Sequence, residues 1–586
     1  MTNIIPIIDV FAGPGGLGEG FSRYCGYFGD GSIQFRVRLS IEKDAVAART
    51  LKLRAFVRAF EEGKLPAAYY DYIKAATPEA RQRAMEQIQA TAEWVEAGKE
   101  AWNATLGKVD FFDLHQRIRS RLGGQELWVL LGGPPCQAYS VVGRSRRMGI
   151  GQETRKRPEN EWQTEAEKRA HAFFRDDTHM LYREYLKIVA LHQPPFFVME
   201  NVKGILSSRI EGVGAGGERE HKKVFEQILA DLEDPWAALK DETWPEGAEA
   251  LFPPQQHGYF IHSFVELPDR VTSSYRHDDY LIRCEDYGVP QERHRVILLG
   301  IRDDLDLVPH PIEAVPAKSR TTLSQVLGDL PKVRSGRSGR KTHKERGDRM
   351  DTPGRWLQAV KDSVTAGMRQ EIGARDNRIL KEMENLLSLA ETELTRGAQF
   401  VPGRAWSQGD SLLKSWYHDE RLEGFLQHET RDHMDADFAR YLFVAAYGVV
   451  NKDSPKLRHF PASLLPDHQN AQTEEGRRIF HDRFRVQLAD KTATTITSHI
   501  RKDGHYFIHY DPKQCRSLTV REAARVQTFP DNYYFEGSRT EQYEQVGNAV
   551  PPLLAAQLAR VVASLIGELL PDRTHRKKLY TEASLA

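Results

Sequence analysis

The feature that most constrains the fold of this chain is a glycine-rich loop near its N-terminus. Residues 4–10 form a short apolar run rich in isoleucine, which is the composition of a buried β-strand. They lead directly into Phe-Ala-Gly-Pro-Gly-Gly-Leu-Gly-Glu-Gly-Phe at residues 11–21. A strand that enters closely spaced glycines and then a helix is typical of nucleotide-binding α/β proteins, because glycine lets the backbone approach a ligand and the helix presents its N-terminal amides. The loop therefore predicts an open α/β sheet with a ligand at its edge.

The spacing of these glycines narrows the kind of ligand. Gly13, Gly15 and Gly16 form Gly-x-Gly-Gly, which is not the dinucleotide fingerprint, and no Lys-Ser or Lys-Thr follows to make a phosphate loop. A second apolar stretch, residues 37–41, ends at Glu42. An acidic residue at the end of the second strand suits the two hydroxyls of a ribose. An ordinary glycine-rich turn remains the alternative.

Cys136 is the first candidate for chemistry. It lies in Gly-Gly-Pro-Pro-Cys-Gln-Ala-Tyr-Ser, residues 132–140, which follows the apolar run at residues 127–131. Proline and glycine end a strand abruptly, so the next side chain is displayed at the carboxyl edge of the sheet. The alternative is that Cys136 is a small buried hydrophobic residue, as most free cysteines are.

Further segments have the same form of an apolar run beside polar residues. Residues 195–199 lead into Glu200-Asn201-Val202, and Gln-Glu-Arg-His-Arg at 291–295 leads into the apolar residues 296–299. Near the C-terminus, Gln-Val-Gly-Asn-Ala-Val-Pro-Pro at 545–552 precedes a closing helix.

The order of these segments resembles that of the DNA cytosine carbon-5 methyltransferases. The resemblance includes the glycine loop, Pro-Cys-Gln, Glu-Asn-Val, Gln-x-Arg-x-Arg, the segment at 518–530 and the Gly-Asn pair at 547–548. It implies a DNA (cytosine-5-)-methyltransferase with an α/β, doubly wound, Rossmann-like S-adenosylmethionine-dependent domain, interrupted by a target-recognition domain.

The resemblance also implies catalytic roles for four residues. The target cytosine must leave the base stack, because its carbon 5 is hidden in the duplex. Cys136 as thiolate would attack carbon 6 of the flipped ring. Glu200 would hold a proton against ring nitrogen 3, with burial as the expected cause of its protonation. Arg295, together with Arg293, would donate to ring oxygen 2.

S-adenosyl-L-methionine is the implied cofactor, and no metal is expected. For the residue that recognises the adenine amino group we choose Asp110, with Asp113 as the alternative, although the family often has Gly-Asp where this chain has Val-Asp. The implied cofactor-binding residues are Phe11, Gly13, Pro14, Gly15, Gly16, Leu17, Glu42, Asp110, Pro134 and Asn548.

The length of 586 residues exceeds what one hydrophobic core supports, so at least two domains are expected. We assign residues 1–302 to the first part of the catalytic domain, with a helical insertion at about 45–106. In this insertion Thr77 and Pro78 have the pattern of a helix start. Residues 303–480 form the target-recognition domain, and residues 481–586 complete the catalytic domain. The closing helix, at 551–570, is expected to pack beside the N-terminal strand.

Within the target-recognition domain, four apolar residues are spaced as on one face of a helix and are expected in a core rather than in a contact. They are Ile379, Met383, Leu386 and Leu387.

The charge balance gives no global attraction to nucleic acid. Lysine plus arginine and aspartate plus glutamate both number 82, so a surface for double-stranded DNA must come from local segregation. Two basic runs, residues 144–157 and 332–349, are candidates for phosphate contacts. A solvated loop is the alternative for each. Arg404 and Lys414 are candidates for base contacts only as guesses.

Four scattered cysteines exclude a disulfide framework and suit a reducing cytoplasm. No long apolar run or basic leader predicts a membrane span or secretory signal. We expect a monomer on DNA in the bacterial cytoplasm. A cognate restriction nuclease, another defence system, a phage origin and a solitary enzyme all stay open as its setting.

Three alternatives stay open. The first is a transfer-RNA cytosine-5 methyltransferase of the same fold, although the chain lacks its Cys-Phe-Thr tripeptide. The second is a catalytically inactive DNA-binding member, although Pro-Cys and Glu-Asn-Val are intact. The third, a nucleotide-binding oxidoreductase, leaves Pro-Cys-Gln unexplained.

Overall fold

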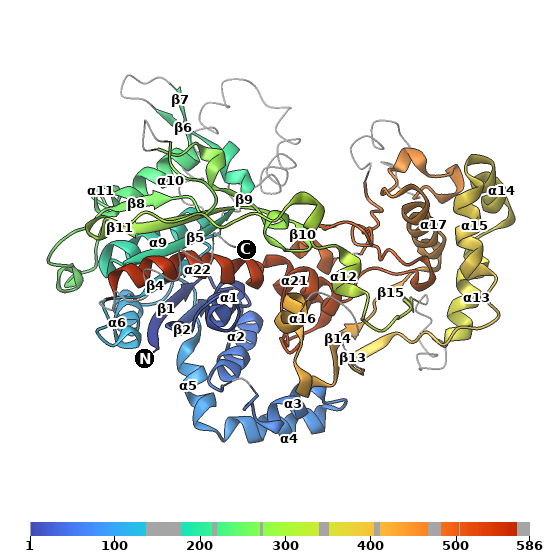
Figure 1. The fold of residues 1–586 in the computed structure, drawn as a ribbon, viewed down its shortest axis with the longest axis horizontal. Helices are drawn as coiled ribbons and strands as arrows, with labels where there is room; N and C mark the ends of the chain where they lie inside the picture. The colour runs from blue at the N-terminus through green and yellow to red at the C-terminus, as the bar shows by residue number, and fades with distance from the viewer. Residues whose placement is uncertain are drawn as a thin grey trace, which may run out of the picture.

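A computed structural model describes most of the chain. The described residues are 2–61, 63–135, 177–213, 219–269, 274–338, 351–403, 411–466, 482–502 and 504–570. Figure 1 shows an elongated molecule, with a large sheet at one end and a group of helices at the other.

The main sheet has eight strands in the order β3-β2-β1-β4-β5-β11-β8, with β9 also paired to β11. The first five of these strands run parallel, and β11 is antiparallel to its neighbours. The strands are β1 (Asn3–Val10), β2 (Ile33–Glu42), β3 (Ala101–Asn103), β4 (Val129–Gly132), β5 (Phe196–Val202), β8 (Tyr259–His262), β9 (Leu281–Arg283) and β11 (His294–Arg302).

Helices cover both faces of this sheet, as the doubly wound prediction requires. On one face, the strand residues Ile5 and Ile7 pack with apolar residues of α1 and α22, whereas Ile8 and Val10 face the opposite core. The helices of the catalytic half are α1 (Gly16–Tyr27), α2 (Ala45–Arg58), α6 (Phe111–Leu122), α9 (Asp177–His192), α10 (Val224–Glu233), α11 (Pro235–Ala238), α20 (Val520–Val526), α21 (Arg539–Asn548) and α22 (Pro552–Leu569). The α/β fold class is confirmed.

The C-terminal helix α22 packs along α1, which follows the first strand. A Cβ atom added at Gly16 would lie 2.2 Å from the carbonyl oxygen of Val550, and one at Gly20 would lie 2.3 Å from that of Pro552. The two helices therefore touch through their backbones. The segment Arg539–Leu569 is long and apolar enough to cross a membrane, but 83% of its most apolar window is buried inside the protein. That burial is typical of a core helix.

The predicted helical insertion is helical for most of its length. It contains α2, α3 (Ala67–Lys74), α4 (Pro78–Gln89) and α5 (Ala92–Glu100). Thr77 caps α4 by accepting a hydrogen bond from the amide of Ala80, as the sequence predicted. The edge strand β3 also falls within the range predicted to be helical. Its three residues are too few to give an alternating pattern.

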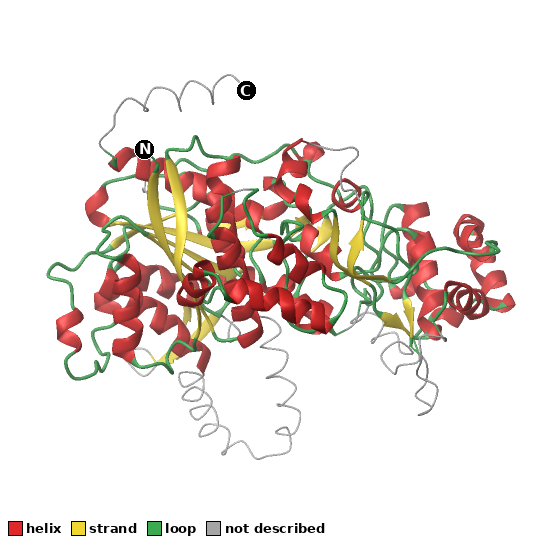
Figure 2. Cartoon of the chain, turned by 90° about the horizontal axis from the view of Figure 1, so that it is seen from below, coloured by secondary structure: helices red, strands yellow, loops and turns green. Residues whose placement is uncertain are grey.

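The other half of the molecule has a separate hydrophobic core. Figure 2 shows that its far end consists of helices. Ile379, Met383, Leu386 and Leu387 are all buried there, which confirms the predicted core face. The α-helices described between β11 and α20 are α12 (Leu323–Leu327), α13 (Pro353–Ser363), α14 (Ala366–Arg375), α15 (Asn377–Leu387), α16 (Ser411–Tyr417) and α17 (Asp435–Asn451).

Four small two-stranded sheets complete the described structure. They are β6 (Arg209–Val213) with β7 (Arg219–Lys223), β10 (Gln291–Glu292) with β16 (Ala493–Thr494), β12 (Gly336–Arg337) with β15 (Asp432–His433), and β13 (Gly397–Pro402) with β14 (Gly424–Glu429). Only β10 with β16 joins the first part of the catalytic domain to the return segment, because β12 and β15 both lie within residues 303–480.

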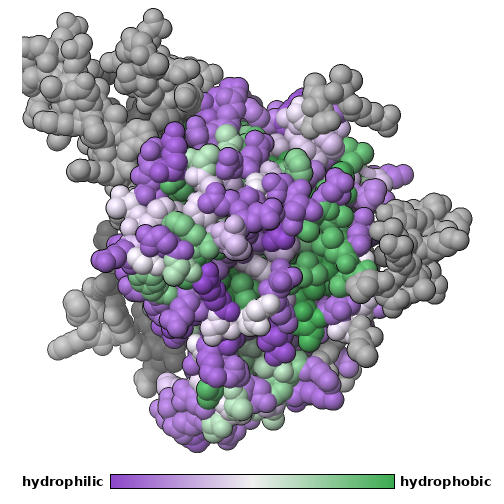
Figure 3. Space-filling model, turned by 90° about the vertical axis from the view of Figure 1, so that its left-hand side faces the viewer, coloured by the Kyte–Doolittle hydropathy of each residue, from purple (hydrophilic) through white to green (hydrophobic). Residues whose placement is uncertain are grey.

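The surface of the sheet-bearing end is mostly hydrophilic. Figure 3 views this end and shows a hydrophobic strip between polar side chains. Such a mixed surface agrees with a chain of which 28% of residues are charged.

Candidate active site

The carboxyl ends of three neighbouring strands lie level at one edge of the sheet. Val10 of β1 lies opposite Gly132 of β4, and Gly132 lies opposite Met199 of β5. The residues that follow in each strand direction are therefore neighbours: the glycine loop, Gly133 and Glu200. The strand order reverses between β1 and β4, and open α/β sheets bind ligands at that point.

The glycine loop adopts a backbone that ordinary residues avoid. Gly13 has φ +57° and Gly15 has φ +95°, both in the left-handed region. A Cβ atom at Gly13 would meet nothing within 4 Å, whereas one at Gly15 would lie 2.8 Å from Leu51. The loop therefore faces open space at Gly13 and packed protein at Gly15. Phe11, with φ +56°, enters the loop from β1, and Leu17 is buried in the first turn of α1.

Glu42 fixes the loop from the end of β2. Its Oε2 accepts a hydrogen bond from the amide of Gly13 at 2.9 Å, and its Oε1 accepts one from the amide of Asp44 at 2.8 Å. Burial raises the pKa of Glu42, partly offset by these two amides. Each carboxylate oxygen has a second lone pair, so Glu42 retains acceptor capacity towards a ligand.

Cys136 lies outside the described residues, but the backbone that leads to it is described as far as Pro135. A Cβ atom at Gly133 would lie 3.1 Å from Oε2 of Glu200, so the chain passes directly over this carboxylate. The side-chain amide of Asn201 donates through Nδ2 to the carbonyl oxygen of Pro134 at 3.4 Å. The Pro-Pro turn and the Glu-Asn pair are therefore in contact.

Glu200 forms an ion pair with Arg295. Nε of Arg295 lies 2.8 Å from Oε1 of Glu200, and the two side chains are 14% and 16% exposed. β11 runs antiparallel to β5, with Arg295 opposite Val202, which brings the two side chains together. Glu200 therefore has a cationic partner in addition to the burial that the sequence analysis expected.

Arg293 occupies a different environment from Arg295. Its side chain is buried, and its guanidinium donates to the carbonyl oxygens of Ile496 at 2.8 Å and Gly547 at 3.3 Å. Burial lowers the pKa of Arg293 to about 9, and the nearby charge of Arg295 acts in the same direction. In this structure Arg293 faces the return segment of the chain rather than Glu200.

The remaining predicted site residues are exposed or bound locally. Asn548 ends α21 with an exposed side chain. Asp110 is exposed at the N-cap of α6, where it accepts a hydrogen bond from the amide of Asp113 at 2.9 Å. Asp113, the alternative, is exposed and lies 3.9 Å from Arg117.

The described part of the second basic run makes internal ion pairs. Lys332 pairs with Asp511, and Arg334 pairs with Asp351. Arg337 pairs in the same way with Asp435. These cations are therefore engaged within the fold. The first basic run, at 144–157, and Arg404 lie outside the described residues, and Lys414 is exposed on α16.

Two residues near the loop escaped the sequence analysis. Asp9 is a buried acid in β1, and burial raises its pKa to about 7. A carboxylate within an apolar run was a visible signal. Tyr533 is fully buried and donates its hydroxyl to the carbonyl oxygen of Pro14. Nothing in the local sequence around Tyr533 points to that contact.

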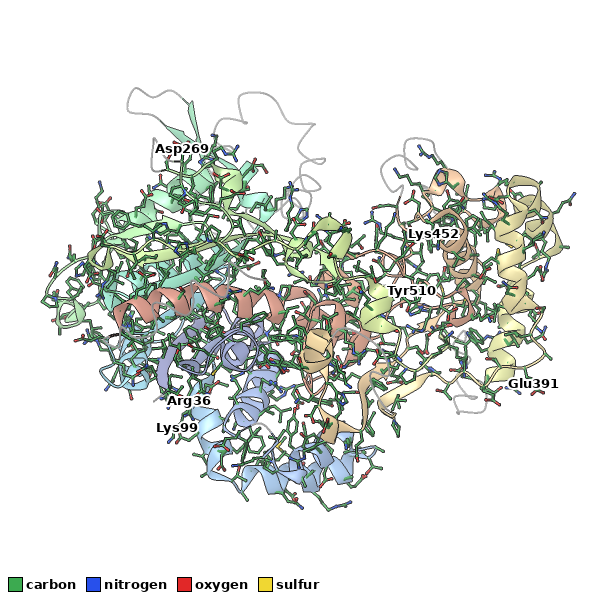
Figure 4. The ribbon with its side chains drawn as sticks, viewed as in Figure 1. Arg36, Lys99, Asp269, Glu391, Lys452 and Tyr510 are labelled. Carbon is green, nitrogen blue, oxygen red and sulfur yellow. The ribbon has the colours of Figure 1, made fainter. Side chains whose placement is uncertain are left out.

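A cavity of about 490 Å³ lies elsewhere, among α12, α15 and the segment 509–516. Its lining includes Lys332, Glu382 and Tyr510, which is labelled in Figure 4, and it includes none of the predicted site residues. The predicted site is therefore separate from this cavity.

Comparison with known proteins identifies the family of the chain. The family model of C-5 cytosine-specific DNA methylases matches residues 165–234 and 269–564, which is more than half of the chain. The type II methyltransferase M.Bpa9945I of Bacillus paralicheniformis is 28% identical over 580 residues, covering 96% of this chain and 99% of that protein.

Two further relatives each match about three quarters of the chain. The type II methyltransferase M.AgeI of Thalassovita gelatinovora is 27% identical and covers 76% of this chain and 86% of its own. The DNA (cytosine-5-)-methyltransferase M.ApeKI of Aeropyrum pernix is 24% identical, with coverage of 76% and 83%. The chain therefore belongs to the C-5 cytosine-specific DNA methylases and is a DNA (cytosine-5-)-methyltransferase.

Proposed function

We propose that the chain transfers a methyl group from S-adenosyl-L-methionine to carbon 5 of a cytosine flipped out of duplex DNA, through a covalent bond to Cys136. One observation carries this proposal. The carboxylate of Glu200 contacts both Arg295 and the backbone at Gly133, three residues before Cys136. A nucleophile, a carboxylate and a guanidinium are the groups that a covalent route needs.

The thiolate of Cys136 adds to carbon 6 of the extruded ring, and the electron pair of the carbon 5–carbon 6 double bond then becomes available at carbon 5. When bound, S-adenosylmethionine would supply an electrophilic methyl group on its sulfonium and would leave as S-adenosylhomocysteine. After carbon 5 has taken this group, loss of its proton to water and departure of the thiolate restore the ring. The described residues contain no group that we assign as the base for this last proton.

Glu200 and Arg295 act on the polar edge of the ring. Glu200 shares a proton with ring nitrogen 3, whose basicity rises as the thiolate adds, and it accepts from the exocyclic amine. Arg295 holds the Glu200 carboxylate in place and donates to ring oxygen 2. Arg293 stabilises the return segment beside the site, because its guanidinium donates hydrogen bonds to the carbonyl oxygens of Ile496 and Gly547.

The residues of the glycine loop fit the cofactor. Gly13 offers backbone without a side chain towards open space, and Glu42 stands beside it with lone pairs left for ribose hydroxyls. We propose that Phe11, Pro134, Asn548 and Asp110 complete this site, with Asp110 towards the adenine amino group.

We propose that residues 303–480 form the target-recognition region between the two parts of the catalytic domain, which are residues 1–302 and 481–586. The separate core of α13, α14, α15 and α17 supports this division. The substrate is double-stranded DNA with a specific recognition sequence.

The cellular setting is also a proposal. Similarity over nearly the whole length to a type II methyltransferase supports a role in restriction-modification, beside a cognate nuclease or other defence proteins. We propose that the enzyme acts as a monomer on DNA in the bacterial cytoplasm.

Bisulfite sequencing of DNA from cells that express the chain tests this function. We expect cytosines in one sequence context to resist conversion, and we expect none to resist in cells with Cys136→Ser, which lacks the thiolate. Binding of S-adenosylhomocysteine should be retained by this variant. Methylation by Cys136→Ser, or modified transfer RNA with unmodified DNA from the wild type, would contradict the proposal.

A further inference from the structure

We propose that Tyr533 is a positioning residue for the cofactor, because its hydroxyl sets the conformation of the glycine loop. This inference rests on the proposed function of that loop. Tyr533 lies far from the loop in sequence, after α20, and touches no reacting atom.

The contact is a hydrogen bond from the Tyr533 hydroxyl to the carbonyl oxygen of Pro14. The same peptide plane carries the amide of Gly15, which donates to the carbonyl oxygen of Ala12 at 2.9 Å. A peptide unit is rigid, so fixing its carbonyl also fixes its amide. Pro14 has no backbone N–H and cannot donate a hydrogen bond to the rest of the protein. The hydrogen bond from Tyr533 to its carbonyl oxygen therefore fixes this point of the loop.

The other amides of the loop are held from β2. Ala12 donates to the carbonyl oxygen of Ile41 at 3.1 Å, and Gly13 donates to Glu42. Without the Tyr533 contact, the Pro14–Gly15 unit would be held on one side only, by the hydrogen bond from Gly15 to Ala12, and the glycines beside Pro14 tolerate both signs of φ. The backbone that approaches the cofactor would then be less well preorganised.

Tyr533 is itself held rigidly. Its ring is fully buried, and the guanidinium of Arg54 lies 4.9 Å from the ring centroid. Arg54 makes two short contacts with Glu19 of α1, at 2.8 and 2.6 Å. It also donates to the side chain of Asn532 at 3.0 Å. Tyr533 is therefore tied to the helix that begins at the glycine loop.

The helical insertion supports the same turn. The hydroxyl of Tyr69 on α3 donates to the carbonyl oxygen of Asn532 at 2.7 Å. Tyr70, the next residue, donates to Asp419, which also accepts from the side chain of Asn532 at 2.8 Å. The helical insertion thus stabilises the turn at residues 532–533, which contacts the glycine loop.

Tyr533→Phe removes the hydroxyl and leaves the ring. Tyr534→Phe is the matched control, since Tyr534 is also buried but its hydroxyl contacts Arg81 in another core. We measure S-adenosylhomocysteine binding by calorimetry on the full chain, together with KM for S-adenosylmethionine and for duplex DNA.

For Tyr533→Phe we expect the Kd and the KM of the cofactor to rise about tenfold, which is the effect of one hydrogen bond. The KM for DNA should stay within about twofold, as should every constant of Tyr534→Phe. A general loss of packing would change both variants alike.

A cofactor Kd within twofold of wild type in a folded Tyr533→Phe, or an equal rise in Tyr534→Phe, would overturn the inference. If Tyr533→Phe does not fold, Tyr69→Phe takes its place, and an unchanged Kd there overturns it. Failure of the wild type to bind the probe would instead overturn the proposed function of the loop.

Discussion

At the scale of single residues, the buried carboxyl group of Asp9 makes stability depend on pH. Burial raises its pKa to about 7, against some compensation from Arg58. In the unfolded chain the proton leaves near the ordinary value of 3.8, so between about pH 4 and pH 7 the folded state holds one more proton. The contribution of Asp9 to the free energy of unfolding therefore falls as the pH rises through this window.

Asp9→Asn should remove this dependence. Relative to wild type, we expect the variant to gain stability progressively from pH 4 to pH 7.5, by up to roughly 4 kcal/mol in total. Urea unfolding of both proteins at intervals of one pH unit measures the difference in their free energies of unfolding. The contributions of the other titrating groups are the same in both proteins and cancel in this difference. A difference that stays constant with pH would show that Asp9 does not titrate in this range.

Glu200→Gln tests the carboxylate beside Arg295. The amide keeps the size but loses the charge and the proton, so we expect kcat to fall by about a hundredfold or more. Binding of S-adenosylhomocysteine should remain, because the glycine loop is held by other residues. Glu292→Gln, an exposed acid on β10, serves as the control and should retain full activity. Equal activity of both variants would remove Glu200 from the chemistry.

The sequence placed Glu200 and Arg295 in one candidate site, and the structure pairs them, but the sequence could not separate the two arginines. Arg293 and Arg295 are two positions apart, which in one continuous strand puts both side chains on the same face. The strand is interrupted between β10 and β11, and Arg293 falls in the interruption. Its partners, the carbonyl oxygens of Ile496 and Gly547, are more than 200 residues away and left no local signal.

At the scale of elements, the contact between α1 and α22 can be tested with two glycines of one helix. A Cβ at Gly20 would lie 2.4 Å from that of Ala555 as well as against the Pro552 carbonyl, whereas one at Gly26 would meet nothing within 4 Å. We expect Gly20→Ala to lower the free energy of unfolding by about 2 kcal/mol or more. Gly26→Ala should raise it by up to about 1 kcal/mol, from helix propensity.

Chemical unfolding of the two variants decides this prediction. Both replacements change glycine to alanine in the same helix. A difference of opposite sign between their free energies of unfolding must therefore come from tertiary contact. Stabilisation by both alanines would mean that α22 does not pack against α1 in solution.

Elements with strong local signals were predictable, and short ones were not. The Thr-Pro start of α4 and the apolar face of α15 depend on neighbouring residues only, so sequence spacing sufficed. The strand β3 has three residues and exists because β2 offers its edge. Such a strand depends on tertiary pairing rather than on its own composition.

At the scale of the whole molecule, the cofactor loop depends on the C-terminal segment. A chain that ends at Glu541 lacks Gly547, Val550 and α22, which contact Arg293, Gly16 and α1. We expect it to lose S-adenosylhomocysteine binding, whereas a chain ending at Leu570 should bind it. Normal binding by the shorter chain, measured by calorimetry, would contradict this dependence.

The division of the chain into a sheet and a separate helical core followed from length and from the position of the motifs. The ion pairs of the second basic run could not be predicted in this way. Its cations pair with acids that are distant in sequence, such as Asp511 and Asp435. Charge counts along a sequence do not reveal such pairing. The identity of the recognised bases depends on side-chain positions in the groove, which no spacing rule supplies.

The most direct test of the central claim is to trap the reaction on duplex DNA that contains 5-fluorocytosine at the target position. Fluorine at carbon 5 cannot leave as a proton does, so the bond between enzyme and ring should persist after methyl transfer. We predict a stable adduct that depends on S-adenosylmethionine and that peptide mass spectrometry maps to Cys136. An adduct on another residue, or methylation of normal DNA without any adduct on the fluorinated duplex, would contradict the account.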